Sequence, residues 1–279
     1  MNGHLYDGSA NAEKISMTQT AIQFNDGAAY ERMMGTWSRL VGDVFLDWLK
    51  PALGLKWIDI GCGNGAFTEQ IVDHCQPSEV LGVDPSEGQL AFARQRPAAR
   101  LARFQQGGAM ELPVADKSFD AAVMALVIFF VPEPARGVAE MVRVTKPGGL
   151  ISAYAWDMFG GGFPLEALRA EVRALGGVPP SPPSSEASRI EVMQKLWIDA
   201  GIEAVETRAI TVQRTFADFE EYWSVSSSRG SSANAALTGL GPEKIAELKE
   251  RMRAKLPPDS AGRITYGATA NAVKGRLPK

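Results

Sequence analysis

The sequence predicts an α/β protein with a doubly wound, mostly parallel sheet. Three observations predict this fold class. A glycine-rich turn with the sequence DIGCGNG occupies residues 59–65 and follows a short apolar run. A second apolar run, residues 80–84, ends in an acidic residue. Strand patterns and helix patterns then alternate along the chain, as they do in parallel sheets that are covered by helices on both faces.

The glycine-rich turn is predicted to join a strand to a helix. Residues 55–60 have strand character, and residues 66–72 begin a helical pattern with apolar positions at 67, 71 and 75. The glycines therefore lie where the backbone can approach a ligand and where the free N–H groups of a helix N-terminus point at it. The turn is typical of a loop that binds a nucleotide-type cofactor.

Glycine spacing alone does not identify the cofactor. Gly61, Gly63 and Ala66 satisfy the dinucleotide pattern G-x-G-x-x-A, so NAD is one candidate. Asp59 favours S-adenosylmethionine instead, because an acidic residue beside the turn would repel a pyrophosphate. S-adenosylmethionine has no phosphate, and its ammonium group could meet this carboxylate.

Further elements follow in the order of a doubly wound sheet. Asp84 ends the second strand, where a carboxylate can bind ribose hydroxyls, although it could also cap a helix at residues 87–94. A third strand is expected near residues 101–105. The apolar run 121–131 is interpreted as a strand buried on both faces, and residues 150–156 as the next strand.

The motifs DIGCGNG, VLGVDPS, AMELPVADKSFD and RVTKPGG, in this order, resemble those of class I S-adenosylmethionine-dependent methyltransferases. The resemblance is to the small-molecule branch that includes ubiquinone/menaquinone biosynthesis-type enzymes, and it is strong over residues 55–156. It implies a Rossmann-like seven-stranded sheet of order 3-2-1-4-5-7-6 with the last strand antiparallel. It also implies methyl transfer from S-adenosylmethionine to an O, N or C atom of a small molecule.

The resemblance also implies the cofactor contacts. Asp59, Gly61 and Gly63 are expected at the methionine moiety, Asp84 at the ribose and Ala125 near the amino group. Three residues are expected to flank the adenine: Pro85, Ala109 and Met110. Three more complete the predicted cofactor set: Cys62, Gln89 and Gly108. Gly108 departs from the family, which usually has Asp there. Residues 128–130 also lack the His that many relatives carry.

The segments outside this core are predicted to handle the acceptor. Residues 1–50 are expected to form an N-terminal helical lid with an amphipathic helix at 40–49, and residues 51–279 the methyltransferase domain. Tyr30 and Trp37 are candidates for cation–π contact with the sulfonium, worth about 0.5–2 kcal/mol, or for plain core packing. A lid insertion is expected at 157–190, with glycines near one end and prolines near the other. This segment is interpreted either as a hinged flap or as a surface linker. A second lid stretch is expected at 215–256.

The sequence offers no confident catalytic residue. Asp157 is the best-placed carboxylate for a general base, while His74 is interpreted as an ordinary helix residue. An aromatic acceptor pocket is predicted from five residues: Trp156, Phe159, Phe163, Tyr222 and Trp223. Positioning and exclusion of water are expected to lower most of the barrier. Two other functions stay open, a non-catalytic cofactor-binding or assembly subunit and an NAD-dependent oxidoreductase.

Composition and charge limit the kinds of binding partner that are expected. A net charge of −3 over 279 residues gives no electrostatic case for nucleic acid or an anionic membrane. Cys62 and Cys75, with two histidines, predict neither a disulfide nor a metal site. No signal peptide is expected, because the N-terminal segment has no apolar h-region, and the longest apolar run is far below the ~20 residues of a spanning helix. A cytoplasmic monomer or homodimer is expected. The cluster Arg94, Arg96, Arg100 and Arg103 is interpreted as a solvated surface.

Overall fold

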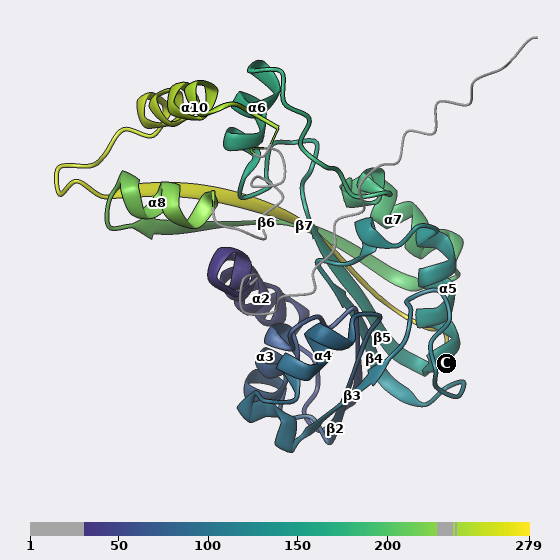
Figure 1. Ribbon diagram of the computed structural model, residues 1–279. Coiled ribbons are helices and arrows are strands. Elements are labelled where there is room, and N and C mark those ends of the chain that lie inside the picture. Colours follow the sequence, from purple (N-terminus) through teal and green to yellow (C-terminus); the bar gives the residue numbers. More distant parts are fainter. Residues whose placement is uncertain (1–30, 228–236, 238) are drawn as a thin grey trace, which may run out of the picture.

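The computed structural model describes residues 31–227, 237 and 239–279 of the chain (Figure 1). It contains a seven-stranded sheet of order β3-β2-β1-β4-β5-β7-β6, which confirms the predicted Rossmann-like topology. β7 is antiparallel to both of its neighbours, and the other paired strands are parallel. The strands have these bounds: β1 Lys56–Ile60, β2 Glu79–Asp84, β3 Ala102–Gln106, β4 Phe119–Ala125, β5 Thr145–Trp156, β6 Glu203–Phe216 and β7 Ile264–Arg276.

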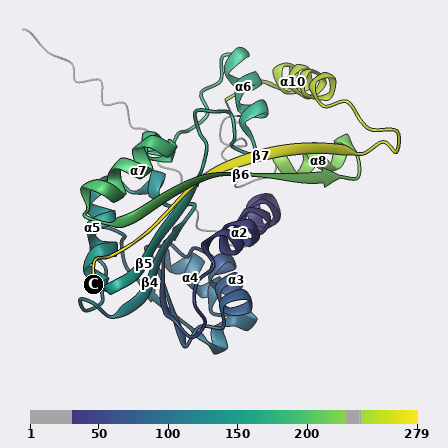
Figure 2. The same ribbon diagram turned by 180° about the vertical axis from the view of Figure 1, so that it is seen from behind.

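Helices cover both faces of the sheet. The α-helices are α2 Thr36–Leu49, α3 Ala66–Cys75, α4 Glu87–Ala93, α5 Pro134–Val144, α6 Glu166–Ala174, α7 Ile190–Asp199, α8 Phe219–Ser226 and α10 Pro242–Lys255. A π-helical turn, η1 Glu31–Gly35, leads into α2, and three short 3-10 helices are η2 Pro97–Arg100, η3 Ile128–Phe130 and η4 Ser185–Ser188. α2, α3 and α4 lie on one side of the sheet, and α5 and α7 lie on the other (Figures 1 and 2).

The two C-terminal strands extend beyond the rest of the sheet. β6 and β7 pair continuously from Arg208 opposite Ala272 to Phe216 opposite Ile264. α6, α8 and α10 gather around this extension, and α2 lies between it and α3 (Figure 1). Four helices of the predicted lid segments, α2, α6, α8 and α10, therefore lie in one region of the molecule (Figure 1).

The core is aromatic where α2 meets the sheet. The rings of Phe45 in α2, Phe67 in α3 and Tyr154 in β5 lie 4.6–6.1 Å apart, centroid to centroid. Phe45 and Tyr154 are almost fully buried. Burying each large side chain stabilises the fold by about 1.5–3 kcal/mol, so this cluster attaches α2 firmly to the sheet.

The apolar run at residues 121–131 is not one strand, and that part of the prediction was wrong. β4 ends at Ala125, and Leu126 has a left-handed backbone with φ of +62°. The Leu126 N–H donates to the carbonyl oxygen of Tyr154 at 2.8 Å, after which η3 begins. Pro134 is the first residue of α5, a position that suits proline because it has no N–H to donate.

Within the residues that the structure describes, no helix is long and apolar enough to cross a membrane. The described chain also has no group of three or more His, Cys, Asp or Glu side chains that could hold a metal ion. Both cysteines are free and buried.

Candidate functional site

The glycine turn after β1 is packed on one side and open on the other. Gly61 has φ of +74°, and a Cβ there would lie 2.5 Å from the side chain of Val127. Gly63 has φ of +52°, and a Cβ there would meet nothing within 4 Å. Glycine is thus required at 61 by the close contact with Val127, and the positive φ favours glycine at both positions. The open side leaves the backbone at Gly63 accessible to a ligand.

Asp84 is fixed beside this turn by two backbone donors. Gly63 N–H donates to its Oδ2 at 2.9 Å, and Ser86 N–H donates to its Oδ1 at 2.8 Å. Burial raises the pKa of the Asp84 carboxyl, and these two hydrogen bonds act in the opposite direction. α4 is capped by the Ser86 hydroxyl, which accepts from Gln89 N–H at 3.4 Å, so Asp84 is not the cap of that helix. Its carboxylate holds the end of β2 against the glycine turn.

Asp59 lies beneath the turn and is fully buried. Its Oδ2 accepts from the Thr68 hydroxyl at 2.6 Å, whereas its Oδ1 has no hydrogen-bond partner among the described residues. Burial raises the pKa of Asp59 to about 7, the Thr68 hydrogen bond lowers it, and the charge of Asp84 raises it. A buried carboxyl oxygen without a donor is unusual and suits a cationic ligand group.

A polar cluster joins the chain before α2 to the glycine turn. The Arg96 guanidinium donates to the carbonyl oxygen of Asn64 at 2.7 Å, to Glu69 at 2.9 Å and to Glu31 at 2.6 Å. The Asn64 amide also donates to Glu31, at 2.9 Å. We call these four residues the Arg96 network. Because the Arg96 side chain is only 10 % exposed, its interpretation as part of a solvated surface was wrong. The network fixes η1 over the turn.

The other predicted cofactor residues lie around the same strand ends. Gln89 and Cys62 are buried, and burial, followed by the charge of Asp59, raises the pKa of the Cys62 thiol. Pro85 and Gly108 are exposed. Three residues are partly buried: Ala109, Met110 and Ala125. A Cβ at Gly108 would meet nothing within 4 Å, so a side chain has room there. Tyr30 lies outside the described residues.

The predicted aromatic pocket is divided in the structure. Trp37, the lid candidate in α2, is 2 % exposed, and its ring meets Tyr266 of β7 edge-on with centroids 6.2 Å apart. Tyr222 lies 6.3 Å from the same Tyr266 ring, and Trp223 stacks at 6.4 Å on Phe219. The α2, α8 and β7 aromatics thus form one cluster around Tyr266.

The remaining pocket candidates lie elsewhere. Trp156 is 2 % exposed at the end of β5, whereas Phe159 is 45 % exposed beneath the Arg189 guanidinium, 3.8 Å from its ring centroid. Phe163 lies under Arg169 at 5.4 Å. The structure therefore brings Tyr222 and Trp223 together, and it places Trp156, Phe159 and Phe163 along the start of the insertion.

Asp157 supports a turn. Its Oδ1 accepts from the N–H of Gly160 at 2.8 Å and of Phe159 at 3.3 Å. The insertion is also bonded to β7 at this end, since Gly162 O accepts from Thr269 N–H at 2.9 Å. The use of Asp157 as a general base stays a prediction, and so does the hinged flap at the insertion. His74, in the last turn of α3, contacts the Gln70 carbonyl oxygen at 3.0 Å, as expected of a helix residue.

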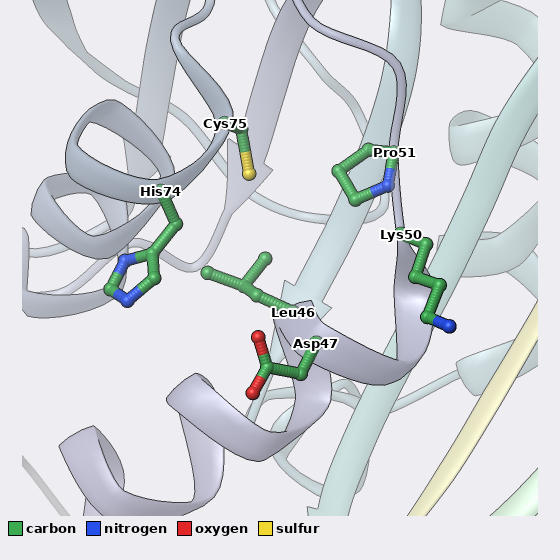
Figure 3. A pocket seen from close by; sticks show the side chains of 6 residues that line it. All are labelled: Leu46, Asp47, Lys50, Pro51, His74 and Cys75. Carbon is green, nitrogen blue, oxygen red and sulfur yellow. The ribbon is translucent and has the colours of Figure 1, made fainter.

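A cavity of about 290 Å³ lies between the C-terminal ends of α2 and α3 (Figure 3). Six residues line it: Leu46, Asp47, Lys50, Pro51, His74 and Cys75. It is at the end of α3 remote from the glycine turn, because Cys75 is the last residue of that helix and Ala66 the first. It is therefore separate from the cofactor loop.

Sequence comparison identifies the family. Residues 58–153 match the model of a methyltransferase domain. A demethylmenaquinone methyltransferase of Renibacterium salmoninarum is 31 % identical over 170 residues, which are 58 % of this chain and 67 % of that one. The chain belongs to the S-adenosylmethionine-dependent methyltransferases that share this domain. The expected enzyme class and cofactor are thereby confirmed, and S-adenosylmethionine is favoured over NAD.

Other relatives match over shorter stretches. A 2-methyl-6-phytyl-1,4-hydroquinone methyltransferase of Oryza sativa is 38 % identical over 120 residues, 42 % of this chain and 36 % of that one. A demethylmenaquinone methyltransferase of Desulfitobacterium hafniense is 35 % identical over 103 residues, 35 % of this chain and 41 % of that one. The chain thus spans about two fifths of the length of these two relatives.

Solved structures share the fold. The YcgJ protein of Bacillus subtilis superposes with a TM-score of 0.58 at 17 % identity, over 86 % of this chain and 98 % of that one. A phosphoethanolamine N-methyltransferase of Haemonchus contortus, solved with S-adenosylhomocysteine, superposes with a TM-score of 0.55 at 18 % identity, over 90 % of this chain and 56 % of that one. At these identities the likeness concerns the fold alone.

Proposed function

We propose that this chain transfers a methyl group from S-adenosylmethionine to a small-molecule acceptor with a hydroxylated, quinol-like ring. The observation that carries the proposal is the turn at Gly63, open on one side and fixed to Asp84 on the other. The relatives named for hydroquinone and demethylmenaquinone substrates support the acceptor class.

The residues around the turn fit the cofactor. The backbone at Gly61 and Gly63 would hold the methionine moiety, and Asp84 would accept from the ribose hydroxyls. Asp59 Oδ1, which lacks a partner in the described chain, would receive a donor from the ammonium side of the ligand. Pro85, Ala109 and Met110 would flank the adenine, and a hydrogen bond to its amine would have to come from a residue other than Gly108.

The bound cofactor supplies a methyl group on a positively charged sulfur. What the protein must add is a fixed direction of approach for the acceptor and a site without water, which together can lower the barrier by several kcal/mol, up to about 7–11. The Arg96 network would keep the turn in place, and the aromatic cluster around Tyr266 would exclude water from the acceptor side. An acceptor that is ionised before it binds gives its proton to solvent, so no base on the protein is required.

The proposal is tested by incubating the protein with methyl-labelled S-adenosylmethionine and fractions of metabolites, followed by mass spectrometry. A labelled product with a hydroxylated ring is expected. Labelled products that are all amines or carboxylic esters would refute the acceptor class, and cofactor binding without any labelled product would favour the non-catalytic subunit. The cytoplasmic location and the monomeric or homodimeric state stay predictions.

A further inference from the structure

Arg169 is a buried cation within the predicted lid insertion. It lies in the middle of α6 and is only 4 % exposed. Its Nη2 donates to the Ser181 hydroxyl at 3.2 Å, and its guanidinium lies over the Phe163 ring. Its Nε has no hydrogen-bond acceptor among the residues that the structure describes. A buried charged donor without an acceptor is costly, and arginine stays protonated in proteins.

Arg169 has only a long ion pair with a carboxylate that a second arginine also contacts. The nearest carboxylate is Glu166, whose Oε2 lies 3.7 Å from the Arg169 Nε, beyond hydrogen-bonding distance. The same carboxylate accepts from Arg173, one turn further along α6. Burial lowers the pKa of the Arg169 guanidinium, Glu166 raises it, and the charge of Arg173 lowers it further. Two guanidinium groups thus share one carboxylate.

Arg251, on the neighbouring helix α10, offers a comparison. Arg251 of α10 contacts both Glu247, at 2.6 Å, and Glu171 of α6, at 3.4 Å. Its side chain is 42 % exposed, so water also solvates it. Arg169 differs from Arg251, because it is buried and has no carboxylate within hydrogen-bonding distance.

The helix that carries Arg169 contacts the aromatic cluster through its first turn. Two residues earlier in α6, the Ala167 N–H donates to the Tyr266 hydroxyl at 3.4 Å. The Tyr266 ring in turn contacts Trp37 and Tyr222. Burial raises the pKa of Tyr266, so its hydroxyl stays neutral and cannot balance Arg169. An anion bound next to this cluster would supply the acceptor that Arg169 Nε lacks.

We propose that Arg169 binds an anionic ring oxygen, a phenolate or enolate, of the methyl acceptor. The proposal rests on the proposed function, because it assumes that the acceptor enters between α6 and the Tyr266 cluster. Binding would favour the ionised form of the acceptor and would give the Arg169 Nε the hydrogen-bond acceptor that it lacks. Arg169 is thus a specificity-determining residue for acceptors that carry a hydroxylated ring.

The test uses 4-nitrophenol, whose phenol and phenolate forms differ in absorbance. It is titrated with pH in the presence of excess protein saturated with S-adenosylhomocysteine. With the unaltered protein, bound 4-nitrophenol is expected to ionise about one pH unit lower than free 4-nitrophenol, a tenfold preference for the phenolate. Arg169→Gln should abolish this change, Arg169→Lys should keep part of it, and Arg251→Gln should keep it all.

Three outcomes would overturn the proposal. One is an unchanged ionisation curve in Arg169→Gln, and another is equal loss in Arg251→Gln. The third is that the unaltered protein binds no phenolate, or binds benzoate in preference to it. S-adenosylhomocysteine affinity, measured by calorimetry in every variant, separates the two proposals. Failure to bind S-adenosylhomocysteine would refute the proposed function, whereas intact cofactor binding with no phenolate effect would refute only the role of Arg169.

Discussion

Replacing Arg96 by methionine should loosen the glycine turn from the chain that leads into α2. Methionine keeps much of the apolar stem but removes the hydrogen bond to Asn64 and the ion pairs to Glu31 and Glu69. Breaking a buried ion pair costs about 3–5 kcal/mol, but Glu31 and Glu69 are 30 % and 18 % exposed and regain water. We therefore expect the free energy of unfolding to fall by about 2–3 kcal/mol, at or just below the lower end of that range.

The same substitution should weaken cofactor binding. Asn64 belongs to the turn itself, and its backbone carbonyl loses a charged donor, so the turn becomes less ordered before binding. A tenfold weaker affinity for S-adenosylhomocysteine, about 1.4 kcal/mol, is expected by calorimetry. Arg94→Met is the matched control, because its guanidinium pairs with Glu87 in solvent and is 44 % exposed. Equal urea midpoints and affinities for the two variants would refute the role of the Arg96 network.

Three further predictions concern the turn and the acceptor side. In the folded protein Asp59 keeps its proton up to about pH 7, whereas in the unfolded chain it loses the proton near pH 3.8. The free energy of unfolding of the cofactor-free protein should therefore fall as pH rises between these two values, by about 1.4 kcal/mol per pH unit. Asp59→Asn should flatten that slope in urea denaturation at pH 5, 6 and 7, and an unchanged slope would contradict the assignment. Gly63→Ala should lower the free energy of unfolding by about 1–2 kcal/mol, because the residue has a positive φ. It should also weaken S-adenosylhomocysteine binding at least tenfold, because the added methyl group occupies the open side of the turn. Normal affinity in calorimetry would argue against this side as the ligand face. Asp157→Asn should retain most single-turnover activity, while Trp223→Ala should lose more; a thousand-fold loss in Asp157→Asn alone would mean that the protein uses a base.

The fold was predictable because its signals are local. The turn at residues 59–65 needs glycine for reasons that involve only its own backbone and the neighbouring strand end, so a short motif reports it. The alternation of strands and helices then follows from apolar periodicity. The run 121–131 was misjudged because every position is apolar or small, so no change of period marks the end of β4. The left-handed Leu126 is not glycine, and nothing in its sequence signals the bend.

The site was predictable only in part. Asp59 lies in the glycine-turn motif and Asp84 in the second motif, VLGVDPS, and the structure brings both to the turn. Glu31 and Arg96, by contrast, are 65 positions apart and meet only in the folded chain. The sequence analysis likewise did not identify Leu126 and Val127 as neighbours of the turn. Val127 approaches Gly61 only because the ends of β4 and β1 are adjacent in the folded sheet. Arg169 was not singled out, since an arginine on a short amphipathic helix is ordinarily solvated.

The central claim is that the glycine turn and Asp84 form an S-adenosylmethionine site. Isothermal calorimetry of the unaltered protein and of Asp84→Asn, with S-adenosylhomocysteine and with NAD, tests it most directly. We expect S-adenosylhomocysteine to bind the unaltered protein and NAD not to bind. Asp84→Asn should bind S-adenosylhomocysteine at least tenfold more weakly, because it loses hydrogen bonds to a charged group worth about 1.5–3 kcal/mol. Binding of NAD, or equal affinity of the two proteins for S-adenosylhomocysteine, would contradict the account.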